Sequence, residues 1–222
     1  MEIHVSSELC SMIPHFQVGI IHYKDIIVEE SPQMLQGKIQ TFQESLYFDL
    51  EDKNVTDYEG IKEWRHVFKL TGKDPNRYRH SAESLFRRIK KHNFLTPVHS
   101  AIDINNFFSL RYQIPIGIYD ADKISGDVLI RTGAETEEYF GLNGRINSLH
   151  HLILSSDDLS PFGSPFVDSE RTSVTRTTKN ALQIIYLRPS LIKEEADKLI
   201  QSLMNMFLQV HGGNGVYQFI KC

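Results

Sequence analysis

Two adjacent asparagines, Asn105 and Asn106, are the residues of this chain best suited to handling a small polar ligand. They open the run NNFFSLRYQIPIGIYDAD, residues 105–122, in which they precede apolar helix-forming residues. A carboxamide both donates and accepts hydrogen bonds, which suits recognition of an ester, a carboxamide or an α-amino group. Because neighbouring helix positions point about 100° apart, we expect one asparagine to face a site and the other to cap the helix or face solvent. A polar pair at a helix start explains the pattern equally well.

Positive side chains gather in a second candidate region, residues 77–92. The region contains Arg77, Arg79, His80, Arg87, Arg88, Lys90, Lys91 and His92. The formal net charge of the chain is −4, so any contact with nucleic acid must come from a local patch such as this one. The simpler alternative is a solvated helix face preceded by a basic loop. Such a patch can also hold a phosphate backbone, because the rest of the chain is acidic.

Other chemistries find no support in the sequence. We find no HExxH motif, no Cys/His cluster with metal-ligand spacing, no P-loop and no GxSxG, so we expect neither a metal nor a cofactor. Cys10 and Cys222 lie near opposite ends without CxxC spacing, and we expect two reduced thiols in a cytoplasmic protein. No apolar run approaches ~18 residues and the first residues lack a signal peptide's features, so we expect no contact with a membrane.

The expected elements give an α+β chain. We expect a strand within residues 16–28, a helix with Ser31 as its N-cap and Pro32 at its first position, and a helix with Ile61, Trp64 and Phe68 on one stripe. A third helix follows Ser81 as its N-cap, and a fourth spans about 101–112. Short strands follow Pro115, and a long amphipathic helix over 190–211 ends the chain. We interpret residues 1–222 as a single compact domain with a mixed or largely antiparallel sheet.

Three stretches of the sequence resemble a known family. They are KLTGKDPNRYRHSAESLFRRI from Lys69, then SAIDINNFFSLRYQIPIGIYDADKISGDVLIRTG, then DSERTSVTRTTKNALQIIY. Together they resemble the B3/B4 domain of the β subunit of bacterial phenylalanyl-tRNA synthetase, which also occurs as freestanding proteins. The most specific markers are D-x-x-N at Asp103 and Asn106, Pro115 nine residues on, and the Tyr119-Asp120 pair. The resemblance covers residues 62–190, with a strand-helix extension over 1–61.

The resemblance implies an α+β domain with a pocket that hydrolyses a wrong aminoacyl ester on tRNA without a side-chain nucleophile. By this likeness Asn106 and Asn105 are the catalytic candidates. The residues expected to contact the substrate are Pro115, Gly117, Tyr119, Glu170 and Ser173. Those expected to contact tRNA are Arg77, Arg79, Arg87, Arg88, Lys90 and Lys91.

The chain departs from the synthetase pattern at Gly117, where the synthetase has histidine. Asn105 stands where threonine is common, and Ser173 falls closest to an acidic specificity residue, with Glu170 as the alternative in another register. Gly117 either retunes the pocket by removing a side chain or supplies a backbone with φ > 0. Two functions therefore remain open. One is hydrolysis of mischarged tRNA in trans, and the other is a non-catalytic RNA- or amino-acid-binding module on the same scaffold.

Overall fold

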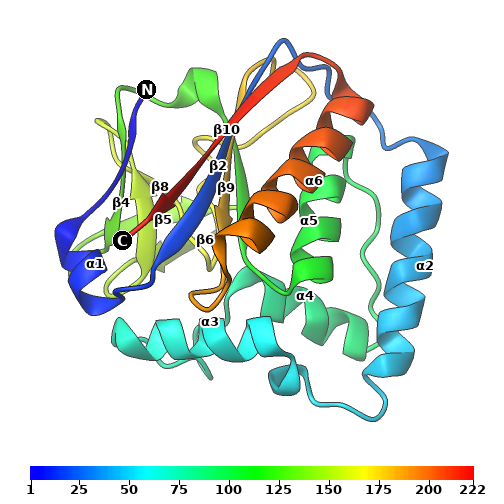
Figure 1. The fold of residues 1–222 in the computed structure, drawn as a ribbon, viewed down its shortest axis with the longest axis horizontal. Coiled ribbons are helices and arrows are strands. Elements are labelled where there is room, and N and C mark those ends of the chain that lie inside the picture. The colour runs from blue at the N-terminus through cyan, green and yellow to red at the C-terminus, as the bar shows by residue number, and fades with distance from the viewer.

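The centre of the fold is a four-stranded antiparallel sheet with the strand order β10-β2-β9-β3. The computed structural model describes residues 1–222. The strands are β2 (Gln17–Lys24), β3 (Ile116–Asp120), β9 (Ala181–Tyr186) and β10 (Asn214–Lys221). β3 and β9 are buried along their whole length, which explains their continuous apolar composition. In Figure 1 this sheet runs through the middle of the molecule.

A second sheet packs beside the first, with the order β1-β4-β7-β8. Its strands are β1 (Ile3–Val5), β4 (Val128–Thr132), β7 (Ile153–Ser156) and β8 (Pro161–Gly163). β1 runs parallel to β4, whereas the other pairs are antiparallel, so this sheet is mixed. β5 (Glu138–Gly141) and β6 (Arg145–Ser148) form a separate hairpin. The expected α+β class with mixed and antiparallel sheets is confirmed.

Helices cover the outer face of the central sheet and the lower edge of the molecule (Figure 1). They are α1 (Ser7–Met12), α2 (Gln33–Asp49), α3 (Glu59–Leu70), α4 (Ser81–Lys90), α5 (Ser100–Tyr112) and α6 (Lys193–His211), with 3-10 turns η1 (Val55–Asp57) and η2 (Ala121–Lys123). α6 packs on the central sheet through Phe207, whose ring stacks on Tyr23 at 4.1 Å. None of the helices combines the length and the apolar composition that crossing a bilayer requires.

Two expected helix caps are wrong. The Ser31 hydroxyl does not cap α2 but donates to the Asp103 carboxylate at 2.5 Å, and Pro32 precedes the helix. At α4 the capping group is the buried His80, whose Nδ1 accepts from the Glu83 N–H, rather than Ser81. Burial lowers the pKa of His80 to about 3, so this imidazole is neutral and is not part of the positive patch.

The expected chain end is also wrong, because α6 is followed by another strand. Gly212 and Gly213 adopt φ of 65° and 74°, which turns the chain back after α6. β10 then pairs antiparallel with β2 from Asn214 to Lys221. Its alternating exposure is typical of an edge strand with one solvated face.

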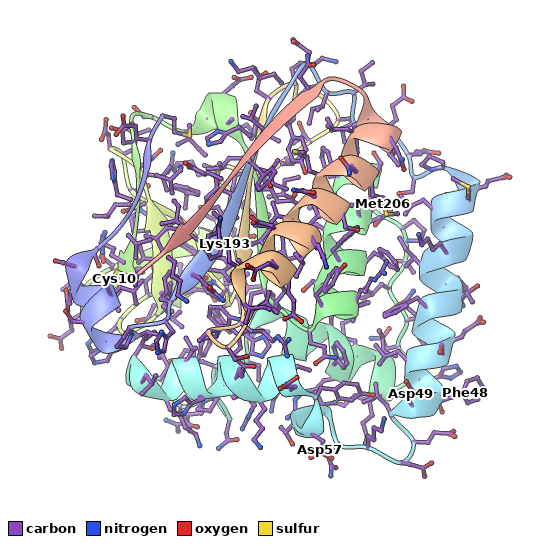
Figure 2. The ribbon with its side chains drawn as sticks, viewed as in Figure 1. Cys10, Phe48, Asp49, Asp57, Lys193 and Met206 are labelled. Carbon is purple, nitrogen blue, oxygen red and sulfur yellow. A yellow bond between two sulfur atoms is a disulfide. The ribbon has the colours of Figure 1, made fainter.

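Cys10 and Cys222 form a disulfide in the structure, so the expectation of two reduced thiols is wrong. Cys10 lies on α1 (Figure 2), and Cys222 directly follows β10. Their Cα atoms are 5.2 Å apart although 212 positions separate them in the sequence. The bond therefore links the two ends of the chain to each other.

Candidate functional site

A hollow of roughly 300 Å³ lies between α2 and α5, and most of the side chains that line it are polar. Its lining consists of Gln36, Gly37, Ile39, Gln40, Gln43, Leu95, Thr96, Pro97, Asp103 and Asn106. α2 supplies one wall, α5 the opposite wall, and the 95–97 loop closes one end. Amide groups predominate, so the hollow offers many hydrogen-bonding groups and little net charge.

Asp103 and Asn106 share one face of α5, because residues three apart on a helix are neighbours. The Asp103 carboxylate is buried and accepts from the Ser31 hydroxyl and the Val98 N–H, which fixes its position. Asn106 is half-buried, and its side chain forms no hydrogen bond within the protein. Its carboxamide is thus available to a molecule that enters the hollow.

The neighbouring amides of the lining already have partners. Gln43 exchanges hydrogen bonds with the backbone of Leu95 in both directions. Gln36 donates to the carbonyl of Ser31, and Gln40 donates to Glu44. Asn106 therefore differs from the other amides around it in having no internal partner.

Asn105 belongs to a different network, in the interior. Its Nδ2 donates to the Ile116 carbonyl at 2.7 Å, and its Oδ1 accepts from Gln183 Nε2 at 3.0 Å. Gln183 in turn accepts from the Tyr23 hydroxyl. Asn105 neither caps α5 nor faces solvent, contrary to expectation; it ties α5 to β3 and β9 in the core. This places its carboxamide in the framework behind the hollow rather than in it.

Gly117 and Tyr119 lie on the opposite face of the central sheet, toward the second sheet. Side chains alternate along a strand, and Ile118 pairs with Gln183, whose side chain reaches the helix face. Tyr119 packs between two glycines: a Cβ built on Gly117 would come within 2.0 Å of its hydroxyl oxygen, and one on Gly163 within 2.2 Å. Gly117 does not adopt a positive φ, so the backbone explanation for this glycine is wrong.

The Tyr119 hydroxyl donates to the Asp168 carboxylate at 2.8 Å. Ser164 N–H donates to the same carboxylate oxygen. Burial raises the pKa of Asp168 to about 7, and the hydrogen bonds from Tyr119 and Ser164 oppose that rise. Burial also raises the pKa of Tyr119, and the nearby Asp168 charge adds to the effect.

None of the remaining substrate candidates, Pro115, Ser173 and Glu170, lines the α2–α5 hollow. Pro115 is buried just before β3, and its carbonyl accepts from the Tyr186 N–H. Ser173 forms an isolated antiparallel bridge with Tyr119. Glu170 is exposed, and its side chain makes no hydrogen bond or ion pair. The structure thus brings Gly117, Tyr119 and Ser173 together and leaves Asn106 on the other side of the sheet.

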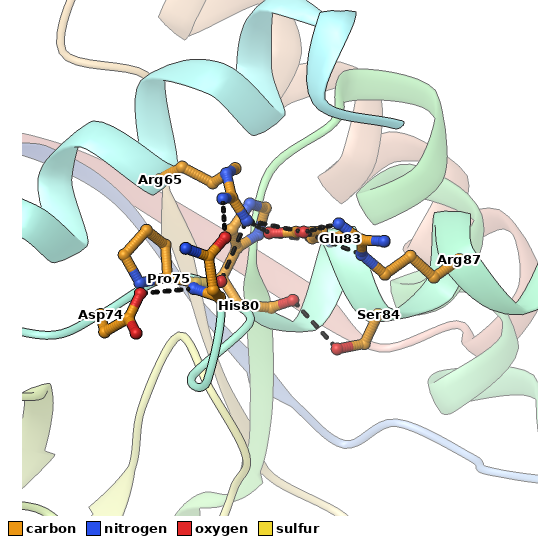
Figure 3. A network of polar contacts seen from close by, with 8 residues as sticks. Arg65, Asp74, Pro75, His80, Glu83, Ser84 and Arg87 are labelled. Atoms are coloured by element: carbon orange, nitrogen blue, oxygen red, sulfur yellow. Dashed lines mark hydrogen bonds and ion pairs between the residues drawn. The ribbon is translucent and has the colours of Figure 1, made fainter. Parts of the chain in front are cut away.

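The positive region is organised by a buried carboxylate (Figure 3). The Glu83 side chain is fully buried and pairs with Arg65 at 2.9 Å and with Arg87 at 2.8 Å. Arg65 also donates to the Pro75 carbonyl and to Asn76, so the same ion pair anchors the loop that precedes α4. Arg87 therefore has a structural role, because it pairs with the buried Glu83.

The other cations of this region reach solvent. Lys90 donates to the Lys53 carbonyl. Arg77, Arg79, Arg88 and Lys91 are exposed and form no ion pair with an acidic side chain. These four residues are the part of the patch that is free to meet a negatively charged partner.

A family model described as the B3/4 domain matches residues 63–203, well over half of the chain. The chain belongs to the B3/4 domain family. An uncharacterized Bacillus subtilis protein, YhzB, is 34% identical over 213 residues and covers 96% of both chains. The phenylalanine–tRNA ligase beta subunit of Fusobacterium nucleatum is 27% identical over 108 residues, which is 47% of this chain and 14% of that subunit.

A second ligase subunit and one solved structure also match this chain. The beta subunit of the same ligase from Bartonella henselae is 30% identical over 90 residues, 40% of this chain and 11% of the subunit. An N-terminal fragment of the phenylalanyl-tRNA synthetase beta subunit from Pyrococcus horikoshii matches with a TM-score of 0.47 and 16% identity, over 96% of this chain and 50% of that chain. By the family model and the sequence matches, the B3/4 chain is homologous to part of the ligase beta subunit, and it spans only a small share of the ligase subunits from Fusobacterium and Bartonella.

The sequence of this B3/4 chain gives a signal for one part of the candidate site and none for two others. The spacing of Asp103 and Asn106 carried a usable signal, because it predicts a shared helix face. The glutamines of α2 carried none, because Gln36 and Gln40 are exposed amides that look like ordinary surface and the buried Gln43 finds its partner Leu95 only 52 positions away. Asp168 was equally hidden: its partner Tyr119 lies 49 positions away, and only the packing of the two sheets brings them together.

Proposed function

We propose that this B3/4 chain binds the aminoacylated 3′ end of tRNA and hydrolyses a wrongly attached aminoacyl ester. The observation that carries the proposal is the unpartnered Asn106 carboxamide in the hollow between α2 and α5. The homology to a tRNA ligase subunit supports tRNA as the source of the ester. The volume of the hollow lies at the lower end of the range for small-molecule sites, which suits an aminoacyl group.

The chemical groups of an aminoacyl ester fit this lining. The α-ammonium group is a cation, and the buried Asp103 carboxylate is the one acidic group in the lining. In this proposal Asn106, on the same face of α5, donates from its Nδ2 to the ester carbonyl, and its Oδ1 accepts a hydrogen bond from the attacking water, whose proton passes to the departing ribose oxygen. A donor aimed at the carbonyl oxygen stabilises the negative charge that develops there as water adds. No side-chain nucleophile is required.

Exposed positive charge at α4 supports contact with the RNA backbone. Arg88 and Lys91 lie at the end of α4, and Arg77 and Arg79 lie in the loop that the Glu83 ion pair anchors. Each phosphate that a cation neutralises releases counterions, so such contacts give an affinity that falls steeply with salt.

A second candidate function is a non-catalytic RNA- or amino-acid-binding module. The observation that favours it is the engagement of Asp103 by Ser31 and Val98, which occupies the carboxylate that a general base would need. The hollow also lacks histidine, cysteine and serine.

A deacylation assay across mischarged tRNAs separates the two functions. We expect Asn106→Ala to lower the hydrolytic rate by ~10² or more with binding retained, the order observed when one transition-state donor is removed. Asn214→Ala is the matched control, because Asn214 is an exposed asparagine of β10 that lies outside the hollow and forms no side-chain hydrogen bond. Binding without hydrolysis by the native chain would establish the module, and normal hydrolysis by Asn106→Ala would exclude the assigned role.

The binding arm of the same experiment uses Arg88→Glu together with Lys91→Glu. We expect weaker tRNA binding and a flatter dependence on salt, with Lys24→Glu, an exposed lysine on β2, as the control. Arg87 is left intact, since its removal would unbalance the buried Glu83. Unchanged affinity would make the patch an ordinary solvated face.

A further inference from the structure

A larger groove of roughly 720 Å³ runs between α2, α5 and α6. It is lined by Pro32, Met34, Leu35, Lys38, Phe108, Arg111, Lys198, Gln201, Ser202, Asn205, Met206, Gln209 and Val210. Figure 2 labels Met206 on α6, which forms one wall. The groove is separate from the positive region of residues 77–92 around α4.

The charge of this groove is one-sided. Lys38 of α2, Arg111 of α5 and Lys198 of α6 contribute a cation from each of its three walls, and no acidic residue lines it. All three side chains are exposed, and none forms an ion pair. In a chain with a net charge of −4, such a convergence of unpaired cations matches a ligand with several negative charges.

The uncharged part of the lining adds a surface for flat rings and for polar edges. Leu35 and Phe108 form a buried apolar floor, and Met34 stands at the rim, 85% exposed and one helical turn before Lys38. A flexible, polarisable methionine packs well against an aromatic ring. Gln201, Asn205 and Gln209 recur every four residues along α6, so their amides form a row on one side; Gln201 donates to the Tyr217 hydroxyl, and Asn205 and Gln209 make no side-chain hydrogen bond.

The groove and the Asn106 hollow are neighbours along the same two helices. On α2, Gln36 and Gly37 border the hollow, and the next residue, Lys38, borders the groove. On α5, Asn106 borders the hollow and Phe108 borders the groove, while the Lys38 ammonium lies 5.4 Å from the centre of the intervening Phe107 ring. A chain that crosses at Lys38 would pass from one site to the other.

We propose that the groove between α2, α5 and α6 binds a short segment of single-stranded RNA, with phosphates at Lys38, Arg111 and Lys198 and bases against the methionine and amide side chains. The assignment rests on the proposed function in one respect: it makes this segment the unpaired nucleotides that lead to the aminoacyl group in the hollow. Bases stacked on side chains and phosphates paired with cations are the usual means of holding a single strand.

The test measures the binding of a short RNA oligonucleotide that carries no aminoacyl group. Binding is followed by fluorescence anisotropy over a range of salt concentrations. For single strands the slope of log affinity against log salt is about 0.7 per neutralised phosphate, so three contacts contribute about 2. We expect the triple variant Lys38→Gln, Arg111→Gln, Lys198→Gln to flatten the slope by about 2 and to weaken binding at least tenfold. The control variant Lys24→Gln, Lys62→Gln, Lys69→Gln removes as much charge from exposed positions outside the groove.

A second variant separates stacking from charge. Met34→Ser should weaken binding without changing the salt slope, because it removes a packing surface and no charge. Wild-type affinity and slope in the groove triple variant would overturn the proposal. Competition by adenosine monophosphate or inorganic phosphate as strong as that by the oligonucleotide would assign the groove to a free phosphorylated ligand instead. Because the probe carries no aminoacyl ester, loss of binding in the triple variant supports the groove even if the native chain hydrolyses no aminoacyl-tRNA.

Discussion

Replacing Gly117 by alanine should destabilise the fold by about 3 kcal/mol, because the space beside this glycine is already filled. The new Cβ would stand 2.0 Å from the Tyr119 hydroxyl oxygen and 2.6 Å from Cζ. Gly163 confines the ring from the other side, so Tyr119 cannot move without leaving Asp168. Overpacking a core costs about 1–3 kcal/mol, and a lost hydrogen bond to a charged group costs about 1.5–3 kcal/mol. The lower chain entropy of alanine in the unfolded state offsets about 0.4–1 kcal/mol.

A double-mutant cycle with Tyr119→Phe tests this explanation by urea unfolding. Tyr119→Phe deletes the atom nearest to the new methyl group, so Gly117→Ala should cost at least about 1 kcal/mol less in that background than in the native chain. Gly37→Ala is the matched control: Gly37 lies in α2 with no atom within 4 Å of an added Cβ, and alanine there should stabilise the helix by up to ~1 kcal/mol. Additive costs for the two changes, within about 0.5 kcal/mol, would refute the packing argument.

The same variants bear on substrate choice. If the absence of a side chain at Gly117 sets the specificity of a pocket, Gly117→His should change which aminoacyl ester the chain hydrolyses, at little cost in stability. The geometry favours the opposite outcome, a large loss of stability with an unaltered ranking of substrates, because the side chain would displace Tyr119 rather than enter an open mouth. Melting curves and deacylation rates measured on one preparation distinguish these outcomes.

Two further predictions concern the Asp168 carboxyl group and the disulfide. The pKa of Asp168 is raised from 3.8 to about 7, so the contribution of its carboxyl group to stability is complete below about pH 4 and is lost as the pH rises to about 7. The difference in unfolding free energy between the native chain and Asp168→Asn, measured by urea titration, should therefore fall by on the order of 4 kcal/mol across that pH range. A difference that stays constant with pH would contradict this prediction. The Cys10–Cys222 disulfide closes a loop of 212 positions, so its reduction should lower the free energy of unfolding by roughly 5 kcal/mol and the Tm by roughly 10–20 °C. The Cys10→Ser, Cys222→Ser double variant should melt like the reduced chain, and reductant should not change its Tm. Equal melting curves of the native chain with and without reductant would contradict this prediction.

Local patterns predicted the helices well, because α2, α5 and α6 each carry an apolar stripe or an apolar run that needs no knowledge of the rest of the chain. The strand β10 was missed because glycines such as Gly212 and Gly213 commonly mark the end of a helix and gave no sign of a strand beyond them. None of the residues of β10 is buried, so its sequence lacks the apolar run of a core strand. The disulfide was missed for another reason. Which ends of a chain meet is decided by the whole topology, and two cysteines 212 positions apart carry no local signal.

The candidate site divides in the same way. The spacing of Asp103 and Asn106 identifies one helix face, and that part of the site follows from helix geometry alone. The expectation that Asn105, Asn106 and Gly117 share one pocket depended on their closeness in sequence. The structure distributes them over the core, the α2–α5 hollow and the space between the sheets, because successive residues of a helix and of a strand point in different directions.

The hollow joins a part of the chain that the family shares with a part that lies outside the family match. Asp103 and Asn106 fall within residues 63–203, whereas the α2 wall, with Gln36, Gln40 and Gln43, precedes that match. The Bacillus subtilis relative covers 96% of this chain and so extends over the α2 region as well. If Asn106 acts on the ester, the reacting group comes from the shared domain, and the surface opposite it comes from the N-terminal extension.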